Sequence, residues 1–276
     1  MLTSLSLLVS IGIAGAHPDS TIPVAPRAPR VVTVHAKEFA FTAPKTVKAG
    51  VTTFRLVNDG KEMHHLTIVK LGDNKTMADF VAAMKNPGPP PSWTTFEGGP
   101  NAALPGGAAE ATLSLEPGNY VMLCVIPSPG ETKPHMAKGM MGPLTVLPAK
   151  AGASVPAPDA TLHLTDYAFS IPATMTPGHH TINVINDAAQ PHELVLVALA
   201  PGKSISDLGD WVEKTLMKGP PPGRPLGGVS ILSSGKSGTF SVDLKPGTYG
   251  LICFAPDAKD GKSHAQHGMT KQFTVN

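Results

Sequence analysis

Two stretches of the chain, residues 31–60 and 160–188, alternate apolar and polar side chains with a period of two. This period places every second side chain on one face, so both stretches predict antiparallel strands with one buried face. Proline and glycine interrupt the alternation, and further apolar runs follow at 66–71 and 194–199. The pattern predicts about seven short strands in each half, which is typical of a β-sandwich.

Each half also contains one segment that favours a short helix. Residues 76–85 and 204–218 follow the apolar runs, and the second has Ser204 or Ser206 as a candidate N-cap. Phe80 and Trp211 are the expected core anchors. A proline-rich run then ends each segment, because proline cannot continue a helix.

The two halves are copies of one unit. Residues 31–147 and 159–276 align along their whole length, and a Pro/Ala-rich stretch at 148–158 joins them. The length of 276 residues leaves room for two ordinary domains. We therefore predict an all-β chain of two tandem β-sandwich domains, each with a short inserted helix.

The first sixteen residues are apolar and end in Ala14-Gly15-Ala16, which is typical of a secretory signal peptide cleaved after residue 16. A membrane anchor is the alternative, but the run is short for a spanning helix. Residues 17–30 form a proline-rich leader. We expect a periplasmic or secreted protein without stable membrane insertion after cleavage.

Net charge is +2 and only 15% of the residues are charged. Such a weak and dispersed charge does not suit nucleic-acid binding, which needs a basic face.

The same three residue types recur near the end of each half with the spacing Cys-x10-His-x4-Met, and a further His lies upstream in an Asn-Asp motif. Alternation places each Cys on the core side of a strand end. A thiolate, two imidazoles and a weakly bound thioether are the ligands of a mononuclear copper site that transfers electrons. The candidate ligands are His64, Cys124, His135 and Met140, then His192, Cys253, His264 and Met269.

These motifs resemble those of the cupredoxin (blue copper) family. The matching segments are NDGKEMHHL and NDAAQPHEL at the first His, GNYVMLC and GTYGLIC at the Cys, and the His-x4-Met ending. The resemblance covers nearly all of 31–276, twice. It implies an eight-stranded Greek-key sandwich and one type 1 copper per domain, up to two per chain. The ten-residue spacing is closer to that of copper nitrite reductases than to that of the smallest cupredoxins.

Three ligand positions have a neighbour of the same type: His65 beside His64, His267 near His264, and Met141 beside Met140. The repeat favours His64, because it aligns with His192. It favours His264 as well, because the first half has Lys138 in the place of His267. A disulfide between the two cysteines is a further alternative in an exported protein, but it would not require the His and Met that follow each Cys.

The leading functional hypothesis is one-electron transfer with a transient redox protein partner. The apolar residues around His135 predict that the first domain docks this partner: Pro134, Met136, Ala137 and Met141. The surroundings of His264 are more polar.

Copper storage or delivery is an alternative function, and a metal-free interaction module is another. A nitrite reductase or multicopper oxidase is disfavoured. In those enzymes a His directly before the Cys leads to a catalytic copper, whereas Leu123 and Ile252 hold that place here.

Overall fold

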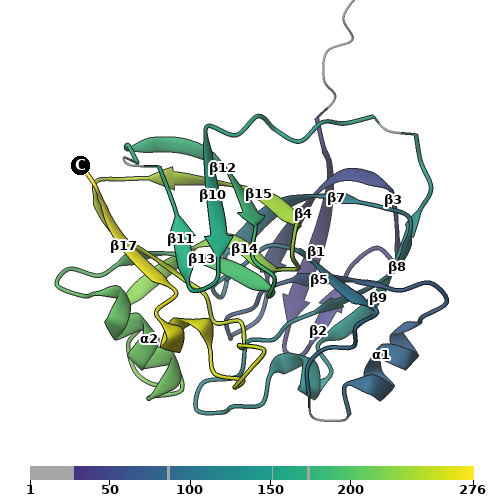
Figure 1. Cartoon of the computed structure of the whole chain (residues 1–276), viewed down its shortest axis with the longest axis horizontal. Coiled ribbons are helices and arrows are strands. Elements are labelled where there is room, and N and C mark those ends of the chain that lie inside the picture. Colours follow the sequence, from purple (N-terminus) through teal and green to yellow (C-terminus); the bar gives the residue numbers. More distant parts are fainter. Residues whose placement is uncertain (1–27, 86–87, 151, 173–174) are drawn as a thin grey trace, which may run out of the picture.

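The computed structural model describes residues 28–276 except 86–87, 151 and 173–174. The predicted signal peptide and most of the leader lie outside the described residues. Among the residues described, no helix is long and apolar enough to cross a membrane. Strands dominate the fold, and short helices lie at its edge (Figure 1).

The first half runs from β1 to β9. Its elements are β1 (Arg30–Lys37), β2 (Ala40–Thr42), β3 (Thr46–Lys48), β4 (Gly50–Asn58), β5 (Thr67–Leu71), α1 (Met77–Ala83), β6 (Thr94–Gly98), β7 (Ala108–Leu115), β8 (Gly118–Leu123), the 3₁₀ turn η1 (His135–Lys138) and β9 (Met141–Leu147).

The second half repeats this order with small differences. Its elements are β10 (Ala160–Thr165), β11 (Ala168–Ser170), β12 (Gly178–Asn186), β13 (His192–Leu199), α2 (Ile205–Glu213), β14 (Gly223–Leu232), β15 (Ser237–Leu244), β16 (Gly247–Ile252), the 3₁₀ turn η2 (His264–His267) and β17 (Thr270–Val275).

Both sheets of the sandwich continue from one half into the other. One sheet has the order β11-β10-β12-β15-β7-β4-β1-β2, and the other β17-β16-β13-β14-β6-β5-β8-β9-β3. The halves meet where β15 pairs with β7 and where β14 pairs with β6. The all-β sandwich prediction is confirmed, and the shared sheets are an addition to it.

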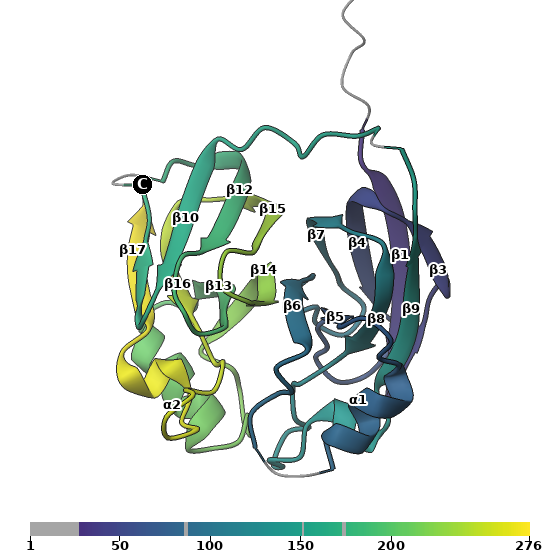
Figure 2. The same cartoon turned by 45° about the vertical axis from the view of Figure 1, so that its right-hand side comes forward.

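The halves lie side by side, with the connecting segment at one end and both short helices at the other (Figures 1 and 2). At their contact Pro100 pairs with Val229, and these two residues hold the same place in the two copies. Equivalent residues meet in this way when two copies face each other around an approximate twofold axis.

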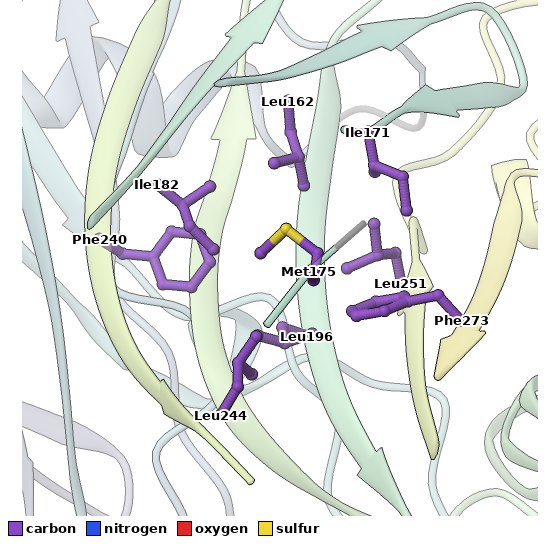
Figure 3. A pocket seen from close by; sticks show the side chains of 9 residues that line it. All are labelled: Leu162, Ile171, Met175, Ile182, Leu196, Phe240, Leu244, Leu251 and Phe273. Atoms are coloured by element: carbon purple, nitrogen blue, oxygen red, sulfur yellow. The ribbon is translucent and has the colours of Figure 1, made fainter. Parts of the chain in front are cut away.

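Each half has its own apolar core between the sheets. Tyr120, Met122 and Cys124 lie in the first core, as the period of two predicts. In the second core an apolar cavity of about 10 Å³ remains (Figure 3). This volume is too small for any ligand beyond a single water molecule. The cores are therefore packed apolar interiors that hold the strand ends in place.

Both helices begin where the sequence predicts. Thr76 and Ser204 are the N-caps, and each forms a reciprocal capping box with the Asp three residues later. Phe80 of α1 is buried, whereas Trp211 of α2 is only half-buried. The predicted range 204–218 is too long, because α2 ends at Glu213 and the backbone at residues 216–217 turns left-handed.

Gly228 provides a test of the close approach between β14 and β13. Its φ is +129°, and a Cβ atom there would lie 2.0 Å from the carbonyl oxygen of Leu194. We expect Gly228→Ala to lower the free energy of unfolding by about 3 kcal/mol or more. The control is Gly235→Ala, where φ is +72° but no atom lies within 4 Å; there the loss should be about 1 kcal/mol. Urea denaturation of both variants compares them, and equal losses would contradict the steric argument.

Candidate metal centres

An asparagine at the end of a strand positions the first His of each site. The side-chain amide of Asn58 donates to the carbonyl oxygens of Glu62 (2.7 Å) and Ala103 (2.9 Å). These bonds hold the loop before β5 against the segment after β6, where His64 and Ala103 form a β-bridge. Asn186 makes the equivalent bonds, at 2.8 Å each, beside His192. The repeated Asn-Asp motif signals this role, although sequence analysis assigned none to it.

Backbone hydrogen bonds join the remaining candidates of the first site. The Cys124 N–H donates to the carbonyl oxygen of Met140 (3.3 Å), and the Met140 N–H donates to that of His135 (3.0 Å). The turn η1 between them ends at Gly139, whose φ is +110°. This left-handed conformation favours glycine. The second half repeats the arrangement, with Gly268 directly before Met269.

In the first half these elements bring two imidazoles and a thiol together. The Nδ1 atoms of His64 and His135 are 3.1 Å apart, and Nδ1 of His135 is 3.6 Å from Sγ of Cys124. All three candidate ligand atoms lie within 4.8 Å of one another. None of the three residues is exposed to solvent. Two imidazole nitrogens and a sulfur atom thus converge on one buried point.

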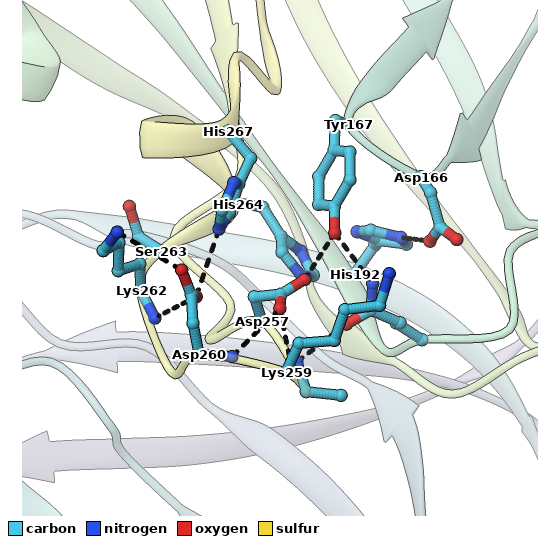
Figure 4. Close-up of polar contacts among 12 residues, drawn as sticks. Asp166, Tyr167, His192, Asp257, Lys259, Asp260, Lys262, Ser263, His264 and His267 are labelled. Carbon is cyan, nitrogen blue, oxygen red and sulfur yellow. Dashed lines mark hydrogen bonds and ion pairs between the residues drawn. The ribbon is translucent and has the colours of Figure 1, made fainter.

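The second half forms the same cluster from His192, Cys253 and His264 (Figure 4 shows its imidazoles and their surroundings). Sγ of Cys253 is 3.9 Å from Nδ1 of His192 and 3.5 Å from Nδ1 of His264. These residues are also fully buried.

The two methionines are buried in the same apolar clusters as their cysteines: Met140 with Cys124, and Met269 with Cys253. Met141, the neighbour of Met140, packs in a different cluster under α1. Both cysteines are free, so the disulfide alternative is wrong.

Burial dominates the protonation of these groups in the metal-free protein. Desolvation raises the pKa of the Cys124 thiol to about 12, and it raises the pKa of Cys253 as well. It lowers the pKa of His64 and His135, and a protonated His135 would lower the pKa of His64 further. The backbone N–H groups of residues 65 and 193 donate to the two sulfur atoms at 3.5 and 3.4 Å. These bonds favour the thiolate that a metal would require.

Carboxylates face the outer nitrogens of the imidazoles, and sequence analysis missed them. Nε2 of His64 lies 3.5 Å from Glu38, and Nε2 of His192 lies 3.0 Å from Asp166. Glu38 and Asp166 occupy the same place in the two copies, three residues after an aligned His, which is the signal that could have found them. Only Asp166 is within hydrogen-bond geometry of its His, and a carboxylate in this position orients a metal-binding His and fixes its tautomer.

The second His of each site is also covered. Nε2 of His135 is 2.9 Å from Glu62, and the ring of Phe39 lies 5.0 Å away. Over His264 lies the ring of Tyr167, at 5.6 Å, and the Tyr167 hydroxyl donates to Asp257 at 2.5 Å (Figure 4). This hydrogen bond is the main cause that lowers the pKa of Asp257.

The competing histidines lie elsewhere. His65 is buried but is not part of the cluster, and its Nε2 accepts the backbone N–H of Val125 at 2.8 Å. His267 is partly exposed and pairs with Asp260 on the rim of the second site.

Of the residues predicted to dock a partner around His135, Ala137 is exposed and Pro134 and Met141 are half-buried, but Met136 is buried. Met136 is only 9% exposed and packs against the cluster that includes Phe80 and Leu123. Met136 is therefore not available for docking, because η1 turns it into the core. Docking of a partner at the first domain stays a prediction.

The donor set is what copper requires: two imidazole nitrogens and one thiol per cluster, with a buried methionine beside them. The two sites fit type 1 copper in cupredoxin-like domains. Up to two copper ions per chain are supported.

Comparison with solved structures returns copper proteins. A dithionite-reduced auracyanin from Roseiflexus castenholzii is 28% identical over 44% of this chain and 100% of its own length, with a TM-score of 0.29. Auracyanin A, a blue copper protein from Chloroflexus aurantiacus, is 23% identical over 43% of this chain and 99% of its own (TM-score 0.31). The copper nitrite reductase of Nitrosomonas europaea is 15% identical over 91% of this chain and 94% of its own (TM-score 0.26).

No protein-family model matches the chain, and no curated protein does. The case for copper therefore rests on the geometry of the two clusters and not on these superpositions.

The burial of both thiols predicts their reactivity in the metal-free protein. Cys124 and Cys253 are 0% exposed, so neither should react with Ellman's reagent at neutral pH while the protein is folded. Both should react promptly in denaturant without a reductant. Rapid reaction of the folded protein, or the absence of free thiols in denaturant, would contradict the observed placement.

Asp166 should matter for metal affinity. Asp166→Asn, made in a Cys124→Ser background so that only the second site is read, should raise the Kd for copper by about tenfold, because His192 loses its charged partner. The control is Asp187→Asn, which removes an exposed carboxylate that pairs with His163 at 2.6 Å. Competition titration with a chelator measures both. Equal affinities would show that Asp166 does not support the ligand.

Proposed function

We propose that the chain binds one copper in each half and acts as an exported one-electron carrier. The observation that supports this proposal most directly is the duplicated, fully buried cluster of two His and one Cys. When bound, copper supplies a Cu(I)/Cu(II) redox couple, which gains or loses one electron. The packed cores keep the ligand groups in one arrangement, which favours fast exchange with little reorganisation.

The proposed ligands come in two equivalent sets, in each of which the Met is the weak axial donor. They are His64, Cys124, His135 and Met140 in the first site, and His192, Cys253, His264 and Met269 in the second.

Electrons would enter through the side chains that cover the second His of each site. Phe39 lies over His135 and Tyr167 lies over His264, and both rings are half-buried. They also hold equivalent places in the two copies. A transient redox protein partner would therefore contact the edge of the sandwich at these two aromatic residues.

Electron transfer is favoured over catalysis by the residue before each Cys. Leu123 is 1% exposed and packs under α1, and Ile252 is 0% exposed and packs under α2. Apolar packing thus occupies the place from which copper enzymes of this architecture reach a second copper. The apolar run that ends at Ala16 supports export to the periplasm or beyond.

Copper loading of residues 17–276 tests the proposal. We expect about two coppers per chain and an intense thiolate-to-copper band, as the ligand set implies. Cys124→Ser and Cys253→Ser should each remove one copper and part of the band, and the double variant should remove both. A protein without the band, or a double variant that keeps it, would overturn the proposal.

Exchange kinetics separate a carrier from a delivery protein. A carrier should be reduced and reoxidised rapidly by small-molecule reagents while it loses copper slowly to a chelator. Fast copper loss together with slow electron exchange would favour delivery.

A further inference from the structure

Three buried polar side chains connect the two sites across the contact between the halves. His65 follows His64, Glu193 follows His192, and Asn101 lies between them in the segment after β6. Their exposures are 2%, 5% and 2%. Buried polar groups without hydrogen-bond partners are costly. Three polar side chains in one buried contact between the halves therefore call for an explanation.

At each end of this series, the polar side chain accepts a hydrogen bond from the residue directly after a cysteine. The backbone N–H of Val125 donates to Nε2 of His65 at 2.8 Å, and the backbone N–H of Phe254 donates to Oε1 of Glu193 at 3.2 Å. His65 and Glu193 also donate their own backbone N–H groups, to the sulfur atoms of Cys124 and Cys253 respectively. The ends are therefore attached to the thiols by two contacts each.

Asn101 closes the gap between the ends. Its Oδ1 lies 3.4 Å from Nδ1 of His65, and its Nδ2 donates to Oε2 of Glu193 at 3.0 Å. We call His65, Asn101 and Glu193 the polar bridge. It is a continuous hydrogen-bonded connection from one cysteine loop to the other.

The donors and acceptors of the polar bridge fix its direction. Because Val125 donates to Nε2, the neutral His65 carries its proton on Nδ1 and donates to Asn101. Asn101 then donates to Glu193, which also accepts from Phe254. Because a backbone N–H donates into the polar bridge at both ends, one of its residues has to accept two hydrogen bonds and donate none. The carboxylate of Glu193 can do this. The difference between His65 and Glu193, at otherwise equivalent positions, follows from this requirement.

We propose that the polar bridge carries an electron between the two copper sites within one chain; this inference rests on the proposed function. With copper bound at both sites, one copper would go from Cu(I) to Cu(II) and the other from Cu(II) to Cu(I), so the exchange would balance at one electron. No bond forms or breaks, and every hydrogen atom of the bridge stays on its donor. The two sites thus act as a connected pair rather than as two separate carriers.

Position 230 of the second half offers a matched control. Ser230 aligns with Asn101, is fully buried, and donates to the carbonyl oxygen of Leu66 in the other half at 3.1 Å. Asn101 likewise donates to the carbonyl oxygen of Leu194, at 3.2 Å. Asn101 also contacts the side chains of His65 and Glu193. Ser230→Ala thus removes a contact between the halves without touching the polar bridge.

The experiment measures electron exchange between the sites after one electron per chain is delivered by pulse radiolysis. A Met269→Leu background makes the two potentials unequal, because the axial ligand tunes the potential. The wild-type bridge should give a re-equilibration phase whose rate does not depend on protein concentration. Asn101→Leu should slow this phase by about tenfold, whereas Ser230→Ala should leave it unchanged. The potential and spectrum of each site should be the same in all three proteins.

A second variant covers the case in which Asn101→Leu fails to fold. Glu193→Gln keeps the size of the side chain but removes the double acceptor, so no orientation of the two amides satisfies every contact. It should slow the same phase. In the metal-free protein both variants should also shift the amide NMR signals of Val125 and Phe254, which reports the bridge without copper.

The outcomes separate the two proposals. A wild-type protein that takes up no copper overturns the proposed function and this inference together. A loaded protein without a concentration-independent phase, or with the same rate in the bridge variants, overturns the polar bridge alone. An equal slowing by Ser230→Ala would assign the effect to the interface in general and would also overturn it.

Discussion

The burial of a thiol and two imidazoles side by side is the constraint on which the rest of the structure depends. Burying such groups without partners costs about 1–3 kcal/mol each. The protein offsets this cost with backbone N–H groups aimed at the sulfur atoms, and with carboxylates bonded to the outer nitrogens of His135 and His192. Asn58 and Asn186 hold the loops that carry the first His. The double sheet provides the strand ends from which all these groups project.

The two halves solve this problem with the same backbone and different surroundings. Phe39 in the first half is replaced by Tyr167 in the second, whose hydroxyl adds a hydrogen bond to Asp257 near the second His. Glu62 contacts His135 in the first half. The electrostatic environment of the two sites therefore differs although the candidate ligands are the same, which favours two specialised sites over two equivalent ones.

Short-range patterns in the sequence predicted much of this structure. The period of two placed Tyr120, Met122 and Cys124 on one face, and the spacing after each Cys identified the residues that converge. The sequence pattern did not reveal that Met136 points inward, because flanking composition does not say which way a loop side chain turns. Nor did it reveal the shared sheets or the role of Asn101. Those features depend on contacts between residues far apart in the chain, which no local pattern encodes.

The unequal pair His65 and Glu193 has a consequence for how such a molecule can be assembled. Two copies of the first half, joined by the same twofold contact, would place an imidazole at both ends, and a donor would face a donor. Two copies of the second half would bring two carboxylates together beside Ser230 in place of Asn101. Neither half can therefore form this buried contact with a copy of itself. Fusion in one chain guarantees that each half always meets its complement, so the tandem arrangement sets a stoichiometry that a homodimer could not.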